Sequence, residues 1–173
     1  MTYKNFKVET DADGIALVTW DIPGKSMNVV DETTGTELAA IVDQVTRDPA
    51  IKGVVITSGK EAFSGGADLG MLEGINRAYV DMLKSKGEEA ANKYVFDESR
   101  KLSLTLRAIE TGGKPWVAAI NGLALGGAFE IVLACHYRVA SENPKTRLGL
   151  PEIKVGLFPG GGGTQRLPRM IQP

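Results

Sequence analysis

The sequence predicts a single domain with an α/β fold. Short apolar runs rich in β-branched residues alternate with longer segments whose apolar residues recur at helical spacing. Glycine-rich segments stand where predicted strands are followed by helices. With 173 residues, of which 43% are hydrophobic, the chain is long enough to bury one sizeable core.

The first third of the chain contains three predicted elements. Residues 15–20, IALVTW, are apolar and rich in β-forming types, and turn residues follow at 21–24, so this run predicts a strand. Apolar residues recur at helical spacing from Asp31 to about Arg47, where Asp48-Pro49 ends the predicted helix. Residues 53–57, GVVIT, predict a second, buried strand.

The middle of the chain predicts a loop, a helical region and a strand. The segment EAFSGGADLGM at 61–71 is rich in glycine and predicts a loop. Residues 73–98 are polar with scattered apolar side chains and predict an exposed helix, and residues 99–109 continue with an amphipathic pattern. Residues 111–115 interrupt this pattern before the apolar run 116–120, which predicts a strand.

The last part of the chain predicts a helix that carries Glu130, followed by a strand at 136–140 and a turn at Asn143-Pro144. The segment LPEIKVGLFPGGGGTQRL, residues 150–167, then predicts a long loop that ends at a helix start near Thr164. No internal repeat or low-complexity tract is present in the sequence.

Charge and composition exclude several classes of protein. The chain has 20 Lys and Arg residues and 21 Asp and Glu residues. Its net charge of -1 argues against a chain that coats nucleic acid or an acidic membrane surface. The single Cys135 lies among apolar residues, so we expect a buried thiol, no intrachain disulfide and a reducing compartment. The N-terminal residues lack the apolar core of a signal peptide, and no apolar run approaches the ~18 residues of a membrane-spanning helix. These observations predict a cytoplasmic protein.

Three glycine-rich segments could present backbone N–H groups to a ligand: residues 64–68, 125–128 and 159–164. Gly127 stands at a predicted helix N-terminus, where its N–H could hold a developing oxyanion, although each segment alone could equally be a tight turn. Gly24-Lys25-Ser26 resembles the end of a phosphate-binding P-loop, but Thr19 occupies the position where that motif needs glycine. The G-x-G-x-x-G dinucleotide fingerprint is also missing at a strand-to-helix junction.

Two isolated glutamates, Glu130 and Glu152, stand among apolar residues near glycine-rich segments. Each alone could be a surface residue, but together they suggest a pair with raised pKa values that moves protons near neutral pH. A metal site is disfavoured because His136 is the only histidine and no cysteine cluster exists. A hydrolase that uses Ser64, His136 and Asp68 is an alternative that the sequence also allows.

Three segments resemble the signature segments of the enoyl-CoA hydratase, or crotonase, superfamily: AFSGGADL, NGLALGGAFEIVLAC and LPEIKVGLFPGGGGTQRLPR. The polar stretch after Asp68 and the amino-acid sequence of the third segment most resemble the hydratase domain at the N-terminus of the multifunctional fatty-acid oxidation α subunit. The resemblance implies the crotonase fold, a spiral of ββα units. It also implies that residues 1–173 are the N-terminal portion of such a domain, truncated at the C-terminus, with an apolar face left exposed and without the dehydrogenase domain of the longer protein.

The resemblance also assigns site residues. It places the oxyanion-hole N–H groups at Gly65 and Gly127 and the two catalytic carboxylates at Glu130 and Glu152. Residues 21–28 depart from the commoner Arg-Pro pattern, but Lys25 matches the position that approaches the CoA nucleotide. The remaining residues that we expect to bind substrate are Gly66, Ala67, Asp68, Leu69 and Gly160.

The function implied by the resemblance is reversible hydration of trans-2-enoyl-CoA to 3-hydroxyacyl-CoA in fatty-acid β-oxidation, together with isomerisation of 3-enoyl-CoA. Hydration needs no metal or redox cofactor, and NAD would serve only the absent dehydrogenase domain. The implied partners are the acyl-CoA substrate and either further copies of the chain or, in the longer protein, a thiolase subunit. A crotonase-fold hydrolase and a folded but inactive fragment remain the alternatives.

Overall fold

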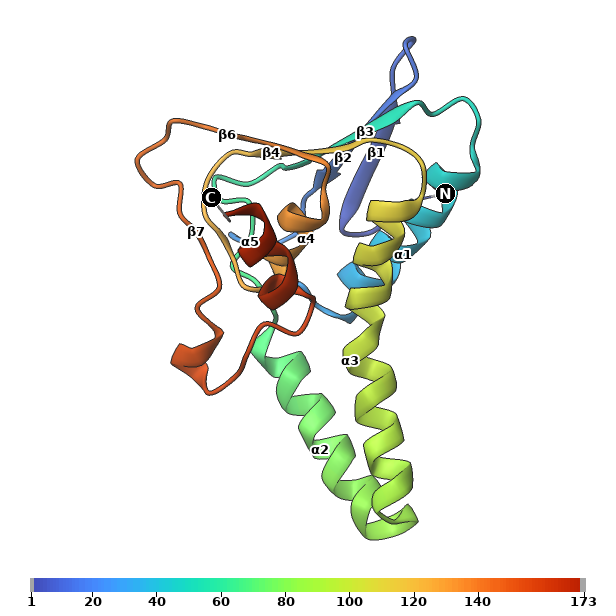
Figure 1. Ribbon diagram of the computed structural model, residues 1–173, viewed down its shortest axis with the longest axis vertical. Coiled ribbons are helices and arrows are strands. Elements are labelled where there is room, and N and C mark those ends of the chain that lie inside the picture. The colour runs from blue at the N-terminus through green and yellow to red at the C-terminus, as the bar shows by residue number, and fades with distance from the viewer. Residues whose placement is uncertain (1, 172–173) are drawn as a thin grey trace.

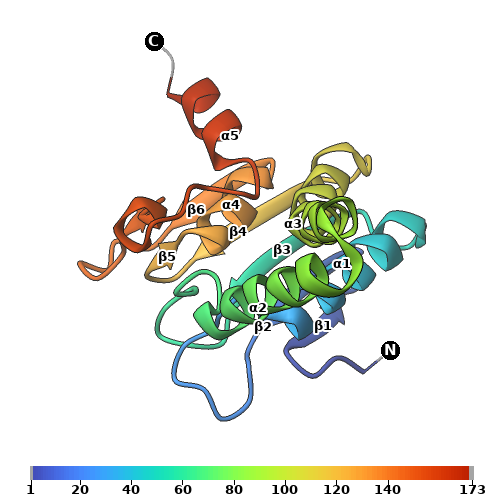
Figure 2. The same ribbon diagram turned by 90° about the horizontal axis from the view of Figure 1, so that it is seen from below.

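The computed structural model describes residues 2–171, which form a mixed sheet with helices packed against it (Figures 1 and 2). The five-stranded sheet has the order β1-β2-β3-β4-β6, in which β1 is antiparallel to β2 and the other neighbours are parallel. A separate parallel pair joins β5 and β7. The strands are β1 (Phe6–Thr10), β2 (Ile15–Trp20), β3 (Gly53–Ser58), β4 (Trp116–Ile120), β5 (Ala124–Leu125), β6 (Tyr137–Ala140) and β7 (Leu148–Gly149).

The helices lie between these strands, which confirms the predicted α/β class. They are α1 (Glu32–Arg47), α2 (Leu69–Lys86), α3 (Glu88–Thr111), α4 (Gly127–Ala134), α5 (Gly163–Met170) and the short 3-10 helix η1 (Glu152–Val155). The predicted strands at 15–20, 53–57, 116–120 and 136–140 and the helix over 31–47 are confirmed to within a residue or so at each end. The predicted helix with Glu130 is α4, and the predicted helix start near Thr164 is the start of α5.

Three features were not predicted. Strand β1 was missed because only Phe6 of its five residues is buried, which leaves almost no apolar alternation to detect. The helical region from 73 to 109 is two helices, separated at Gly87, where a positive φ of +86°, which glycine adopts readily, breaks the helix. The expected long loop at 150–167 contains the turn of 3-10 helix η1.

The core lies between the sheet and helices α1, α3 and α4. Strand β2 alternates in burial, with Ala16, Val18 and Trp20 inside. The Trp20 ring stacks on Phe6 at a centroid distance of 5.7 Å and meets Phe63 edge-on at 6.1 Å. All eight residues of α4 are buried, as expected for a helix that is apolar on every side except at Glu130. Cys135 is also buried, as predicted, and burial raises the pKa of its thiol to about 12.

Helices α2 and α3 form a hairpin that projects from the rest of the structure (Figure 1). None of the residues of α2 is buried, whereas Leu106 and Ile109 near the end of α3 belong to the core. Among residues 2–171, no helix is both long enough and apolar enough to cross a membrane.

Exposed apolar side chains are frequent after β4. They are Tyr137, Val139, Leu148, Ile153, Val155, Leu157, Phe158, Met170 and Ile171.

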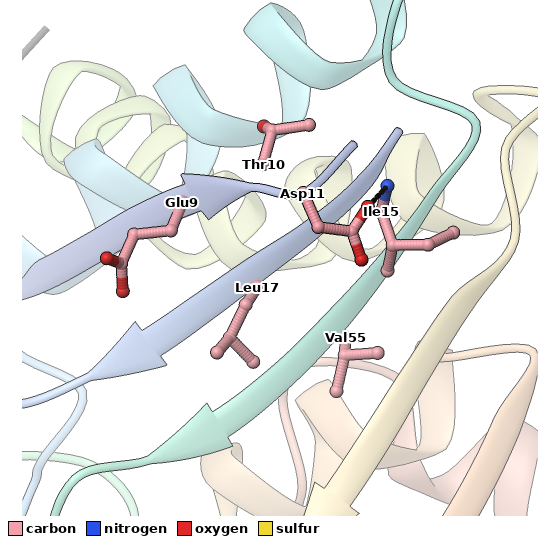
Figure 3. A pocket seen from close by; sticks show the side chains of 6 residues that line it. All are labelled: Glu9, Thr10, Asp11, Ile15, Leu17 and Val55. Atoms are coloured by element: carbon pink, nitrogen blue, oxygen red, sulfur yellow. Dashed lines mark hydrogen bonds between the residues drawn. The ribbon is translucent and has the colours of Figure 1, made fainter. Parts of the chain in front are cut away.

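A shallow hollow lies on the sheet face opposite the core, beside the turn between β1 and β2 (Figure 3). Ile15, Leu17 and Val55 line it with apolar side chains. The carboxylate of Asp11 at its edge accepts hydrogen bonds from the N–H groups of Asp13, at 3.0 Å, and Ile15, at 2.9 Å. Asp11 therefore stabilises the hairpin turn, and the hollow lies at the start of β2, away from the glycine-rich loops that follow β3 and β4.

Candidate active site

The glycine-rich segments that follow β3 and β4 lie side by side. These two strands are parallel, so their C-terminal ends reach the same edge of the sheet. The Ser64 N–H donates to the Leu123 carbonyl at 2.9 Å, and the Leu125 N–H donates to the Ser64 carbonyl at 3.2 Å. A Cβ on Gly66 would lie 2.7 Å from the Leu125 carbonyl oxygen, so this approach of the two backbones requires glycine.

The third glycine-rich segment reaches the same place from the C-terminal part of the chain. Strand β7 pairs with β5, and the Gly126 N–H donates to the Gly149 carbonyl at 2.9 Å. Residues 161–163 then pass over α4, where a Cβ on Gly161 would lie 2.7 Å from Oε2 of Glu130. Three segments that are far apart in the sequence thus meet around the first turn of α4.

Glu130 is the buried carboxylate of this site. Its side chain is in the first turn of α4 and is 2% exposed, which excludes the alternative of a surface residue. Oε1 accepts a hydrogen bond from the Gly163 N–H at 2.7 Å, and Gly163 is the first residue of α5. Unpaired N–H groups and the partial positive charge of a helix N-terminus stabilise a carboxylate, so α5 supplies the partner that burial of Glu130 requires.

Glu152 lies next to the same backbone turn. It begins helix η1, and its Oε1 would be 3.3 Å from a Cβ on Gly126. Its Oε2 is buried and has no hydrogen-bond partner among residues 2–171. Loss of solvent raises the pKa of Glu152 above 4.5, and the negative charge of Glu130 raises it further. The structure therefore brings together the two glutamates that the sequence singled out.

The raised pKa of Glu152 predicts a dependence of stability on pH. Between pH 4.5 and the higher pKa of the folded chain, the folded state binds more protons at this site than the unfolded state, so its contribution to stability falls as pH rises. We expect the free energy of unfolding of Glu152→Gln to rise relative to that of the wild type over this interval and to stay higher above it. Urea unfolding from pH 4 to 8, followed by fluorescence of the buried Trp20 and Trp116, measures the difference. A difference that does not vary with pH would contradict the assignment.

One predicted oxyanion donor needs correction. The N–H of Gly65 donates to the Asn28 carbonyl at 3.0 Å, so it is not available to a ligand. Val30, two residues after Asn28, bonds to both neighbours of Ala67. Its N–H donates to the Gly66 carbonyl at 2.8 Å, and its carbonyl accepts from the Asp68 N–H at 3.0 Å. In such a parallel bridge the N–H of Ala67 itself points away from Val30.

The available donors are therefore Ala67 and Gly127. Gly127 is the first residue of α4 and has no carbonyl of the preceding turn to bond. Neither N–H has a hydrogen-bond acceptor among the residues that the structure describes. The sequence could not distinguish Gly65 from Ala67, because the direction of each N–H depends on pairing with residues 28–30.

Asn28 holds this region together, and the sequence analysis missed it. Its amide nitrogen donates to the carbonyl of Trp20 at 2.8 Å, to Ser58 Oγ at 2.9 Å and to the carbonyl of Phe63 at 3.3 Å. Its Oδ1 accepts from the Ile22 N–H at 3.0 Å, and the residue is fully buried. A buried polar side chain with this many partners fixes the ends of β2 and β3 relative to the loop at 64–68.

The other predicted substrate-binding residues have the following positions. Asp68 caps α2 by accepting from the Met71 N–H at 3.0 Å, a hydrogen bond that lowers the pKa of its carboxyl group. Lys25 lies 3.4 Å from Asp68 in an ion pair, so the structure brings these two together. Leu69 is 62% exposed, and the carbonyl of Gly160 accepts a hydrogen bond from Ser103 Oγ at 3.0 Å.

The structure contradicts the alternative Ser64, His136 and Asp68 constellation. Nδ1 of His136 accepts from the Trp116 N–H at 3.1 Å, at the start of β4. Ser64 pairs with Ala124, beyond the end of β4. Strand β4 alone extends about 13 Å from Trp116 to Ile120, so at least this distance separates the two positions. Ser64 Oγ also already donates to the Asn28 carbonyl at 2.9 Å. Within residues 2–171, no cluster of three His, Cys, Asp or Glu side chains could hold a metal ion.

Fold and site together define an α/β protein in which two carboxylates share a helix N-terminus with unpaired backbone N–H groups. Comparison with known proteins agrees with this class: residues 10–173 match the family model described as enoyl-CoA hydratase/isomerase. The chain belongs to the enoyl-CoA hydratase/isomerase family.

Similar proteins are known both from sequence and from solved structures. Over 170 residues, or 97% of this chain, it is 42% and 44% identical to the fatty acid oxidation complex subunits alpha of Idiomarina loihiensis and Shewanella frigidimarina. It spans 22% of the length of these relatives. The enoyl-CoA hydratase of Bacillus anthracis has a TM-score of 0.75 and 30% identity over 96% of this chain and 58% of that one. Pseudomonas aeruginosa DspI gives a TM-score of 0.75 and 31% identity over 95% and 60% of the two chains.

Proposed function

We infer that this chain contributes the site at which the full-length protein binds trans-2-enoyl-CoA thioesters and catalyses the reversible addition of water to give 3-hydroxyacyl-CoA. The observation that carries the proposal is the pair of glutamates, Glu130 and Glu152, held at the start of α4 beside the unpaired N–H of Gly127. The names of the similar proteins support fatty-acid β-oxidation as the setting.

The unpaired N–H groups of Ala67 and Gly127 would receive the thioester oxygen. Negative charge develops on this oxygen when water attacks Cβ, and donors already fixed by the fold stabilise that charge without reorganising. Ala67 replaces Gly65 in this role because the N–H of Gly65 is engaged by Asn28.

The two glutamates would divide the proton transfers. Glu130 has one oxygen engaged by the Gly163 N–H, and the proposed role of its second oxygen is to orient and deprotonate the attacking water. Glu152 would exchange the proton at Cα. Its raised pKa suits this role, because a carboxyl group that holds its proton more readily than usual can donate that proton as well as accept one. With the same groups, one proton shuttle and enolate stabilisation would also isomerise 3-enoyl-CoA to 2-enoyl-CoA.

Lys25 and Asp68 are proposed to lie near the CoA part of the substrate, with Gly66, Leu69 and Gly160 at its edges. The reaction as written needs no metal or redox cofactor. NAD would serve a dehydrogenase domain, and association with a thiolase subunit or further copies of the chain is proposed from the names and the resemblance alone.

We further propose that residues 1–173 are the N-terminal portion of a hydratase domain. The support is that the chain covers 58% of the Bacillus anthracis hydratase. Activity is therefore best measured on the full-length protein, beside the 173-residue chain, for which we expect little or no turnover.

The test is hydration of crotonyl-CoA and of a long-chain 2-enoyl-CoA, followed by loss of the enoyl-thioester absorbance. The expected result is turnover by the full-length protein that disappears when both glutamates are replaced. A fluorophosphonate probe should leave the protein unlabelled, since Ser64 is buried and remote from His136. Thioester hydrolysis without hydration, or labelling of Ser64, would overturn the proposal.

A further inference from the structure

Arg166, on α5, connects helix α3 to the loop that precedes α5. Its Nε donates to Oε1 of Glu110 at 2.6 Å, and its Nη2 donates to Oε2 at 3.1 Å. Its Nη1 donates to the carbonyl of Gly161 at 2.6 Å. The two side chains are 12% and 25% exposed, and the guanidinium lowers the pKa of Glu110. A two-pronged ion pair shielded from solvent to this degree fixes geometry better than an exposed single contact does.

The loop that Arg166 holds consists of four consecutive glycines, 160–163, and glycine leaves the backbone more freedom than any other residue. Three hydrogen bonds with side chains fix it. Ser103 Oγ donates to the Gly160 carbonyl, Arg166 donates to the Gly161 carbonyl, and the Gly163 N–H donates to Glu130. Ser103 and Glu110 are seven residues apart on α3, so they lie on the same face of that helix.

The orientation of the Glu130 carboxylate depends on this loop. Among residues 2–171, the Gly163 N–H is the donor that bonds the Glu130 carboxylate, and Gly161 lies so close that a Cβ there would be 2.7 Å from Oε2. A shift of the loop would therefore turn the carboxylate. Reactions between groups held in place are sensitive to such shifts, and about 1 Å of misplacement can cost about 10²-fold in rate.

We propose that Arg166, itself held by Glu110, is a positioning residue that fixes the glycine loop and through it the carboxylate of Glu130. The inference rests on the proposed function, because it concerns the rate of the reaction assigned to Glu130. Arginine is required here, since a lysine ammonium cannot bond both oxygens of Glu110 in a planar fork and reach the Gly161 carbonyl as well.

The test compares Arg166→Met and Glu110→Gln with the wild type in crotonyl-CoA hydration by the full-length protein. We expect kcat to fall by about 10-fold or more in Arg166→Met, and by less in Glu110→Gln, with KM within about threefold of the wild-type value. In a Glu130→Gln background, Arg166→Met should lower kcat no further, because the two changes act on one group. The matched control is Arg169→Met, one turn further along α5, whose side chain donates to the carbonyl and Oε1 of Gln165 in the same helix and whose kcat should be unchanged.

Two results would overturn the positioning role. One is an equal loss from Arg166→Met in the wild-type and Glu130→Gln backgrounds, and the other is a rise in KM with unchanged kcat. Circular dichroism and melting curves check folding. If Arg166→Met does not fold, kcat of Glu110→Gln is compared in the wild-type and Glu130→Gln backgrounds instead. If Glu130→Gln itself hydrates as fast as the wild type, the proposed function fails. If Glu130→Gln is impaired but Arg166→Met and Glu110→Gln are not, only the positioning role fails.

Discussion

Replacing Glu130 with Gln is expected to lower kcat for crotonyl-CoA hydration by at least about 10²-fold, because the general base of the proposed reaction is lost. Binding should change little. The amide oxygen of Gln can still accept the Gly163 N–H that now bonds Oε1 at 2.7 Å, so the loop over α4 keeps its anchor. The measurement is kcat and KM from the enoyl-thioester absorbance, with the dissociation constant of a non-reacting saturated acyl-CoA as the readout of binding.

The matched control is Glu142→Gln, which makes the same chemical change at an exposed position outside the site. Its kcat should equal that of the wild type. A Glu130→Gln variant with near-normal kcat would remove Glu130 from the proton transfers. A variant whose acyl-CoA binding fell in parallel with kcat would indicate that Glu130 holds the fold of the site and is not its base.

Replacing Gly127 with Pro is expected to lower kcat by about 10²-fold to 10³-fold, the usual loss when one oxyanion donor is removed. Gly127 is the first residue of α4, and this is the helix position where proline fits best, since the N–H it lacks has no partner within the helix. The variant should therefore keep α4 intact, and the loss follows from replacing the N–H with the Cδ of the proline ring, which cannot donate a hydrogen bond to the thioester oxygen.

Gly127→Ala is the matched comparison, because it keeps the N–H. A Cβ at this position would lie 3.7 Å from Leu102 Cδ2 and 3.8 Å from Val30 Cγ2, which are ordinary contact distances. Alanine should therefore cost far less activity than proline. Both variants are assayed for kcat, and their melting temperatures are compared with that of the wild type. Equal activity of the proline and alanine variants would exclude Gly127 as a donor to the thioester oxygen.

The environment of Glu152 shows how the proposed site lowers the stability of the folded chain. A carboxyl group with a buried oxygen that has no hydrogen-bond partner in the described chain lowers stability at neutral pH, yet the same loss of solvent raises its pKa toward the range useful for proton exchange. A Glu152→Gln variant that is more stable but less active would show both effects of one environment.

The sequence by itself determined the local elements of this chain and singled out its two isolated carboxylates. The spacing of apolar residues between 31 and 47 and the apolar runs at 15–20 and 116–120 predicted α1, β2 and β4, because these patterns depend only on neighbouring residues. Glu130 and Glu152 were conspicuous for a similar reason: an isolated carboxylate in an apolar segment is costly unless it has a function or a partner.

Only the tertiary structure decided how these groups are paired. The Gly163 N–H that meets Glu130 is 33 residues away, and the Glu110 that holds Arg166 is 56 residues away, so no local pattern reports either contact. The availability of Ala67 in place of Gly65 follows from hydrogen bonds to Val30 and Asn28, and a shift of one residue in that pairing would reverse it. Residue types and periodicity are properties of the sequence, whereas the direction of an N–H and the partner of a buried charge depend on which distant segments the fold places together.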